Sequence, residues 1–267
     1  MVIDSSIFKA YDIRGLYPGE INEVVVRQIG RAYVAYLSAE RIGVSRDMRV
    51  SSPALADAFI HGAREQGADV VDYGMMATDM LYFGVVQDGL DGGVQITASH
   101  NPGEYNGIKM VRAAALPLSG DAGIGDIRDM VEQDGIPAST GDRGALTLRN
   151  VIAPYIEKVL SFIDPSAITP FSVVLDAGSG MAGLVAPPLF SRLPCRVTPL
   201  CFDIDGTFPH HQANPLIAKN RAHITERVVA EGADIGIAWD GDADRCFFID
   251  DSGEFIAGDF VTALLAE

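Results

Sequence analysis

Segments with the pattern of buried strands alternate with helical segments along most of this chain, and this alternation restricts the fold to the α/β class. In the first half, the spacing of apolar residues predicts helices over 24–36 and 54–65 and strands over 48–50, 68–74 and 93–97. We therefore expect the strands of this half to form one sheet with the helices packed against it.

A second alternation of the same kind follows a polar stretch. Residues 134–142 consist mainly of Gly, Pro, Ser, Thr and Asp, which is typical of an interdomain connection, and we place the domain boundary near Arg143. The elements expected after it are a helix over 151–162, strands over 171–176, 196–202 and 233–238, and a final helix over 259–267. The 267 residues suffice for two domains of ordinary size, so we expect two similar α/β units in series.

Net charge, hydropathy and cysteine content exclude several classes of protein. The formal net charge of -16 would repel a nucleic-acid backbone, so no nucleic-acid partner is expected. No apolar run approaches the length that spans a bilayer and the N-terminus lacks the pattern of a secretory signal, so we expect no membrane segment and a cytoplasmic location. Because Cys195, Cys201 and Cys246 contain no CxxC pair, reduced thiols are expected rather than a disulfide framework or a zinc knuckle.

Three carboxylates at alternate positions mark a short loop that follows a predicted strand. Asp240, Asp242 and Asp244 lie between apolar residues on both sides, and on a tight loop they can converge on one hard cation. An EF-hand would need Gly at the sixth position and Glu at the twelfth, where this chain has Arg245 and Asp251. The loop therefore predicts a magnesium site with positions left open for a phosphate oxygen.

A serine follows the strand predicted over 93–97. Ser99 lies in the sequence Thr-Ala-Ser-His-Asn-Pro, which contains no Gly-x-Ser-x-Gly elbow. A serine is a weak nucleophile unless a neighbour activates it or it already carries the group to be transferred. From this hexapeptide alone, the favoured interpretation is a loop serine that bonds to the local backbone.

Two further patterns leave other functions open. Residues 178–183 read Gly-Ser-Gly-Met-Ala-Gly after a strand, with Asp203 about twenty residues on, as in a dinucleotide-binding fingerprint. Residues 203–207 read Asp-Ile-Asp-Gly-Thr, which looks like the nucleophile loop of haloacid-dehalogenase-type phosphatases, with Asp203 as the phosphorylated residue. For each stretch the favoured interpretation is a structural turn in which glycine relieves backbone strain.

Taken together, the motifs resemble the α-D-phosphohexomutase superfamily, and most closely its phosphomannomutase/phosphoglucomutase branch. Residues 9–15 look like the family's substrate loop, 46–53 like its next element, 97–102 with 106–109 like the phosphoserine loop and its trailing lysine, and 240–245 like the magnesium loop. The resemblance also accounts for the two glycine-containing stretches as ordinary elements of the second domain.

The resemblance implies two consecutive phosphoglucomutase-type α/β domains, each with a mixed sheet between helices. Residues 1–142 would form domain I with the substrate and phosphoserine loops, 143–256 domain II with the magnesium loop, and 257–267 the entry helix of a truncated third domain. Family members normally have four domains. The sugar-recognition loop of the third and the phosphate-binding loop of the fourth are not in this sequence.

The resemblance further implies a mechanism. Phospho-Ser99 would donate its phosphoryl group to a hexose phosphate, and the resulting hexose bisphosphate would turn around and return its other phosphate, which interconverts the 1-phosphate and the 6-phosphate. The implied catalytic residues are Ser99, His100, Lys109, Arg14 and Arg245, the implied substrate-binding residues are Lys9, Tyr11, Arg14 and Lys109, and the implied Mg²⁺ ligands are Ser99, Asp240, Asp242 and Asp244. Either Lys109 or His100 would transfer the proton of the sugar hydroxyl.

The implied partners are a hexose phosphate substrate and a hexose bisphosphate activator. Because two family loops are missing, we also consider a second class of function, a phosphorylatable, metal-binding scaffold. Such a scaffold could be one part of a split enzyme, with a complementary chain supplying the missing domains.

Overall fold

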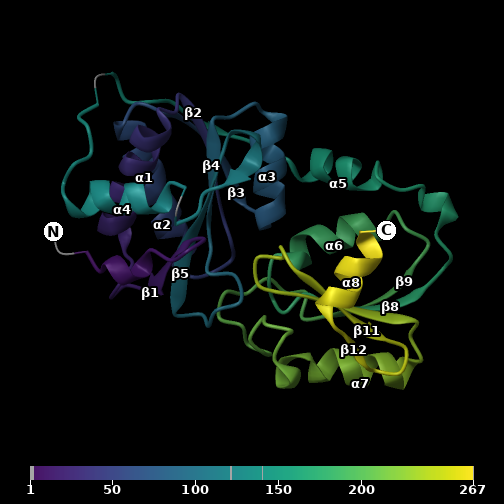
Figure 1. Cartoon of the computed structure of the whole chain (residues 1–267). Helices are drawn as coiled ribbons and strands as arrows, with labels where there is room; N and C mark the ends of the chain where they lie inside the picture. The colour runs from purple at the N-terminus through teal and green to yellow at the C-terminus, as the bar shows by residue number, and fades with distance from the viewer. Residues whose placement is uncertain (1–2, 121, 140, 267) are drawn as a thin grey trace. The chain divides into compact units, whose positions relative to one another are not determined.

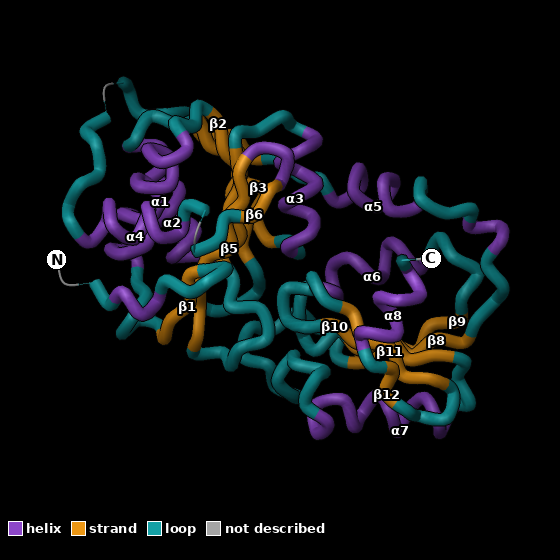
Figure 2. The backbone as a smooth tube through the Cα atoms, in the orientation of Figure 1, coloured by secondary structure: helices purple, strands orange, loops and turns teal. Residues whose placement is uncertain are grey.

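The computed structural model describes residues 3–120, 122–139 and 141–266. Its contacts divide the chain into two compact units, each a sheet covered by helices (Figures 1 and 2). Unit 1 comprises the residues up to Ala98 together with Pro102–Val151. Unit 2 comprises Ser99–Asn101 together with the residues from Ile152 onward. The three residues of the serine loop therefore group with the second unit although the first unit flanks them in sequence.

The described residues of unit 1 form a mixed sheet of seven strands. Its strands are β1 (Ile13–Leu16), β2 (Arg41–Arg46), β3 (Asp69–Met75), β4 (Gly92–Ile96), β5 (Tyr105–Arg112), β6 (Leu116–Pro117) and β7 (Leu146–Leu148). The order is β1-β5-β4-β2-β3-β7, and β6 pairs with β5. Strands β4, β2, β3 and β7 run parallel, and β1 and β6 run antiparallel to β5, which is itself antiparallel to β4. All residues of β4 are buried, as expected for a central strand covered on both faces.

Helices cover both faces of this sheet. Figure 1 shows α1 (Glu23–Leu37), α2 (Ser52–Glu65) and α4 (Ile124–Glu132) on one face and α3 (Thr78–Gln87) on the other. Helix α1 begins after Asn22, whose side chain accepts hydrogen bonds from two backbone N–H groups of the first turn. Helices α1 and α2 approach closely because Gly62 has no side chain: a Cβ there would lie 2.0 Å from the carbonyl oxygen of Arg27.

In unit 2, the part of the chain that the structure describes forms a mixed sheet of five strands. Its elements are β8 (Ser172–Asp176), β9 (Arg196–Leu200), β10 (Ile235–Trp239), β11 (Cys246–Asp250), β12 (Phe255–Ile256), α5 (Ile152–Leu160), α6 (Ala182–Phe190), α7 (Ala222–Glu231) and α8 (Gly258–Leu265). The order is β12-β11-β10-β8-β9, with β9, β8 and β10 parallel and the other two pairs antiparallel. The 3₁₀ helices of the two units are Ser5–Ile7, Ala113–Ala115, Pro165–Ala167 and Ala218–Arg221.

Strand β8 shows how sequence places the core of unit 2. Val174 packs on one face with Ile224 and Val228 of α7, whereas Val173 and Leu175 pack on the other face in a cluster that includes Ala186 of α6. Successive strand residues point to opposite faces, so an uninterrupted apolar run is buried on both.

The expected fold class is confirmed: both units are α/β with mixed sheets. The strand predicted over 48–50 is wrong, because the strand of this region is β2, which ends at Arg46. The segment after it turns so that Arg49 can be buried beside Asp47. Glu267 of the predicted final helix lies outside the described residues. None of the described helices is long and apolar enough to cross a bilayer.

Candidate active site

The acidic loop connects β10 to β11, which are antiparallel neighbours paired through Trp239 and Cys246. The backbone N–H of Ala243 donates to the carbonyl of Asp240 at 3.0 Å, and Ala243 has a φ of +60°. This tight connection places one carboxylate oxygen from each of Asp240, Asp242 and Asp244 within 4.8 Å of the others. The predicted convergence of three carboxylates is confirmed.

The loop concentrates negative charge away from water. Asp240 and Asp242 are 1% and 0% exposed, whereas Asp244 reaches solvent. Burial, followed by the charges of Asp242 and Asp244, raises the pKa of Asp240 to about 7, and Arg245 partly counteracts this rise. Three oxygen ligands that repel one another when ionised fit a hard divalent cation such as Mg²⁺, whose charge would relieve the repulsion.

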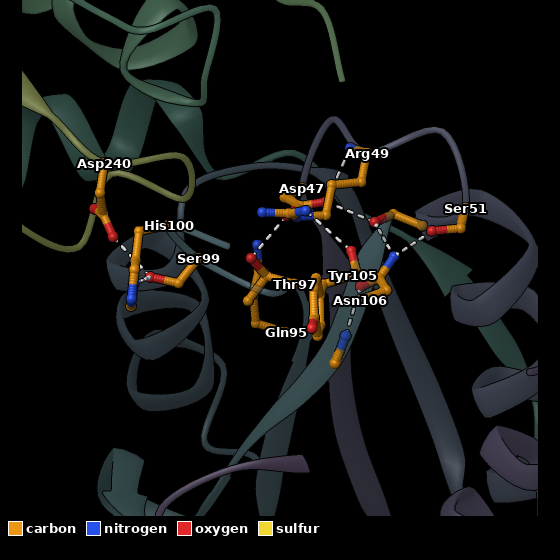
Figure 3. Close-up of polar contacts among 12 residues, drawn as sticks. Asp47, Arg49, Ser51, Gln95, Thr97, Ser99, His100, Tyr105, Asn106 and Asp240 are labelled. Atoms are coloured by element: carbon orange, nitrogen blue, oxygen red, sulfur yellow. Dashed lines mark hydrogen bonds and ion pairs between the residues drawn. The ribbon is translucent and has the colours of Figure 1, made fainter. Parts of the chain in front are cut away.

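Ser99 bonds directly to this loop (Figure 3). Its Oγ donates to Oδ2 of Asp240 at 2.7 Å. The same oxygen accepts from Nη2 of Arg245 at 2.6 Å. Ser99 is 2% exposed and has a φ of +52°, a left-handed conformation that is unfavourable for a residue with a side chain. Strain of this kind, held by two charged partners, is characteristic of functional positions.

His100 joins the same cluster. Nη2 of Arg245 lies 2.6 Å from Nδ1 of His100, and that nitrogen is 3.4 Å from Oγ of Ser99. Because a guanidinium only donates hydrogen bonds, Nδ1 of His100 is the acceptor in this contact. Arg245 also forms an ion pair with Asp240. The structure thus brings together six of the predicted site residues in unit 2: Ser99, His100, Asp240, Asp242, Asp244 and Arg245.

The glycine-rich stretch between β8 and α6 supports the acidic loop. The N–H of Met181 donates to the carbonyl of Gly241 at 2.9 Å. A Cβ at Gly180 would lie 2.6 Å from that same carbonyl oxygen, so only glycine permits the two loops to touch. The glycine pattern therefore has a structural reason that requires no dinucleotide.

Gln212 forms a hydrogen bond to the serine loop, residues 99–101. Its Nε2 donates to the carbonyl of His100 at 2.7 Å. Sequence reasoning missed this residue, because a glutamine in an irregular stretch carries no local signal of a partner 112 positions away.

A buried ion pair in unit 1 fixes both ends of the segment that carries Ser99 (Figure 3). Asp47 accepts from Nε of Arg49 at 3.1 Å and from Oγ1 of Thr97 at 2.7 Å, and neither charged side chain is exposed. Nη1 of Arg49 donates to the carbonyls of Pro102 at 2.6 Å and Tyr105 at 2.9 Å. Thr97, Pro102 and Tyr105 are therefore all bonded to one ion pair, whose Arg49 was predicted to lie in a strand.

The other predicted site residues lie in unit 1. Arg14 forms an ion pair with Asp12 and stands opposite Gly107 in the β1–β5 register. Lys109 is two positions along β5 from Gly107, so it shares a face of the sheet with Arg14 as its diagonal neighbour.

Lys9 and Tyr11 occupy the exposed loop before β1. Tyr11 is 81% exposed, and the backbone N–H of Lys9 donates to the carbonyl of Asp12 at 2.8 Å. The four predicted residues of unit 1 thus lie on β1 (Arg14), on β5 (Lys109) and in the loop before β1 (Lys9 and Tyr11).

The fold and this site define a two-domain α/β protein with a three-carboxylate loop bonded to a buried serine. The chain belongs to the phosphoglucomutase/phosphomannomutase family: residues 5–135 match its alpha/beta/alpha domain I and residues 153–253 match its alpha/beta/alpha domain II. The resemblance found in the sequence is confirmed.

Individual relatives agree with this assignment. The chain is 42% identical over 269 residues to a phosphomannomutase of Salmonella typhimurium and 43% identical over 261 residues to phosphohexose mutases of Xanthomonas campestris. Each match covers 97% of this chain and 58% of the relative. A crystal structure of a phosphoglucomutase/phosphomannomutase family protein from Burkholderia thailandensis superposes with a TM-score of 0.90 at 34% identity, over 99% of this chain and 60% of that one.

Proposed function

We propose that this chain carries the phosphoserine and magnesium half of a phosphohexomutase active site, in which phospho-Ser99 exchanges its phosphoryl group with hexose phosphates. The observation that carries the proposal is the position of Ser99 Oγ between a carboxylate of the acidic loop and the guanidinium of Arg245. A phosphoryl group on that oxygen would lie beside both a cation site and a permanent positive charge, which suits phosphoryl transfer because the reaction depends on positioning and charge stabilisation.

Asp240, Asp242 and Asp244 would hold Mg²⁺, which when bound supplies positive charge next to the phosphoryl oxygens. Support for this metal comes from a solved relative, N-acetylphosphoglucosamine mutase of Aspergillus fumigatus, whose crystal structure contains GlcNAc-6P and magnesium; at 14% identity and a TM-score of 0.55 it shares the fold. The donor set here, all carboxylate oxygens, is what a hard cation requires.

The chain's own residues would carry the remaining steps. In the forward direction the bond between Oγ of Ser99 and phosphorus breaks as a hydroxyl oxygen of the sugar phosphate bonds to that phosphorus, and the hydroxyl proton passes to Lys109 or His100. Arg245 would stabilise the charge on the transferring group. Lys9, Tyr11, Arg14 and Lys109 would bind the substrate, with hexose bisphosphate as the intermediate and activator.

The chain spans 58% of the length of the curated relatives that it matches. The complete mutase reaction is therefore a proposal for this sequence, and the alternative is a phosphorylatable, metal-binding scaffold that needs a complementary chain. A cytoplasmic location belongs to the proposal and agrees with the three free cysteines.

A turnover assay distinguishes the two functions. The purified chain is incubated with Mg²⁺, a hexose 1-phosphate and a trace of the hexose 1,6-bisphosphate, and the 6-phosphate is measured for glucose and mannose substrates. Formation of 6-phosphate by the wild type and by a Ser161→Ala control, with loss in Ser99→Ala, supports a self-sufficient mutase. Absence of turnover in a folded wild type that still accepts phosphate on Ser99 supports the scaffold. Equal turnover in Ser99→Ala would refute both.

A further inference from the structure

Three donor atoms of different chemistry converge in unit 2 outside the acidic loop. A carboxylate oxygen of Asp176, Sγ of Cys201 and a ring nitrogen of His211 lie within 4.8 Å of one another. They come from the end of β8, from the residue after β9 and from the irregular segment before α7. The mechanism proposed above uses none of them.

The ligating atoms are oriented by their neighbours. Nδ1 of His211 lies 3.1 Å from the carbonyl of Gln212, and Nε2 lies 3.0 Å from Oδ2 of Asp176. The other carboxylate oxygen of Asp176 accepts from the N–H of Gly178 at 2.9 Å. In metal sites, outer-shell groups bond to the far nitrogen of a histidine ligand and to the second oxygen of a carboxylate ligand, and these bonds orient the ligands. The carbonyl of Gln212 and the N–H of Gly178 are placed to do this here.

Two members of the site are buried, and the third, Cys201, also lines a cavity. Asp176 and His211 side chains are 2% and 8% exposed. Cys201 lines a cavity of about 280 Å³ together with His210 and His223, so three of the chain's five histidines lie at or beside the cluster. The ring of His223 stacks 6.0 Å from that of His211. Because Cys201 borders this cavity, the cavity would serve as the entry path that a metal site requires.

One polar atom next to the cluster lacks a partner in the described part of the protein. Ser179, whose N–H donates to the carbonyl of Cys201 at 2.8 Å, has a buried Oγ with no hydrogen-bond partner among the described residues. A buried polar atom without a protein partner usually bonds to a water molecule or an ion.

We propose that Asp176, Cys201 and His211 form a second metal site, specific for Zn²⁺ and similar borderline-soft cations, with one coordination position open toward the cavity. Sulfur and imidazole nitrogen select such cations, whereas the all-carboxylate loop selects Mg²⁺. The residue after His211 is Gln212, which holds the carbonyl of His100. A cation at this site is therefore one residue from a contact that positions the serine loop.

Cobalt provides the test, because a bond between Co²⁺ and a thiolate gives an absorption band that carboxylates cannot produce. The full chain is titrated with Co²⁺ in excess Mg²⁺, which occupies the acidic loop, and the Co²⁺ is then displaced by Zn²⁺. We expect a saturable thiolate band at one Co²⁺ per chain, its loss in Cys201→Ser and His211→Gln, and its retention in Cys195→Ser and Cys246→Ser. No band in the wild type, or a band that persists in Cys201→Ser, would overturn the proposal.

A measurement on the wild type alone covers the case in which these variants misfold. The thiols are alkylated with and without Zn²⁺, and each is quantified by peptide mapping. We expect Zn²⁺ to slow modification of Cys201 several-fold and to leave Cys195 unchanged. Equal rates at Cys201 with and without Zn²⁺ would contradict the site, and they would leave the proposed phosphoryl chemistry of Ser99 untouched.

Discussion

The charge crowding at Asp240 predicts an unusual dependence of stability on pH in the metal-free protein. The pKa of this carboxyl is about 7 in the folded chain against an ordinary value of 3.8. Below pH 3.8 the group is neutral in both the folded and the unfolded states. Between pH 3.8 and about 7 the folded state keeps the proton that the unfolded state has lost, so the free energy of unfolding falls as the pH rises.

The magnitude follows from the size of the shift. Each unit of pKa corresponds to about 1.4 kcal/mol, so the rise from 3.8 to about 7 costs the folded state up to ~4 kcal/mol once Asp240 is ionised. Mg²⁺ binds the folded state only, and it should restore most of this stability at pH 8 and little at pH 5.

Trp239 supplies the assay, because it is the chain's single tryptophan and directly precedes Asp240. Urea unfolding is followed by its fluorescence at pH 5, 6, 7 and 8, in EDTA and in Mg²⁺. We expect Asp240→Asn to flatten the fall in stability in EDTA and to reduce the stabilisation by Mg²⁺, whereas the exposed control Asp251→Asn should behave as the wild type does. An equal fall in Asp240→Asn, or a benefit of Mg²⁺ that is the same at pH 5 and pH 8, would refute the reasoning.

Three other substitutions test separate parts of the site. Gly180→Ala places a Cβ 2.6 Å from the carbonyl oxygen of Gly241, so it should lower the unfolding free energy by about 1–3 kcal/mol and weaken Mg²⁺ binding. The control Gly258→Ala, which has open space around its Cβ, should change neither quantity. If titration calorimetry gives the same Mg²⁺ affinity for Gly180→Ala as for the wild type, the glycine-rich stretch does not support the acidic loop. Arg49→Met leaves Asp47 buried without its partner, so urea denaturation should show an unfolding free energy about 3–5 kcal/mol lower than that of the wild type. The control Arg27→Met, at the exposed pair with Glu65, should lower it by only ~0–1 kcal/mol. Similar losses in the two variants would contradict the role of the buried pair of Asp47 and Arg49. Arg245→Lys retains the charge but replaces the guanidinium, which contacts Ser99 through Nη2 and Asp244 through Nε, by a single ammonium nitrogen. Transfer of phosphate from Ser99 in a rapid-quench assay should therefore slow by about 10²–10³-fold, whereas Arg227→Lys should leave the rate unchanged. A rate within twofold of the wild type would exclude this role of Arg245.

Local sequence patterns were sufficient to predict the features that depend on residues close together in the chain. The α/β alternation follows from apolar runs whose periods differ between strands and helices, and most of the central elements lie within a few residues of their predicted bounds. The convergence of Asp240, Asp242 and Asp244 could also be predicted, since a short connection between two strands leaves their side chains little room to diverge.

Contacts between distant segments could not be read in the same way. The bond from Ser99 to Asp240 spans 141 residues, and only the resemblance to a family linked the two motifs. Arg49 looks like part of a strand in the sequence, because nothing local shows that it is buried against the carbonyls of Pro102 and Tyr105. The cluster of Asp176, Cys201 and His211 likewise depends on where β8 and β9 end in the folded sheet.

The central claim is that Ser99 is the phosphoryl carrier, and it is tested most directly by mapping phosphate on the intact protein. The purified chain is dephosphorylated, incubated with a hexose 1,6-bisphosphate and Mg²⁺, and analysed by mass spectrometry of its peptides. We predict phosphate on Ser99, a large decrease in Asp242→Asn or in EDTA, and none in Ser99→Ala. A wild-type Ser99 that remains unmodified, or phosphate that appears on Asp203 instead, would contradict the account.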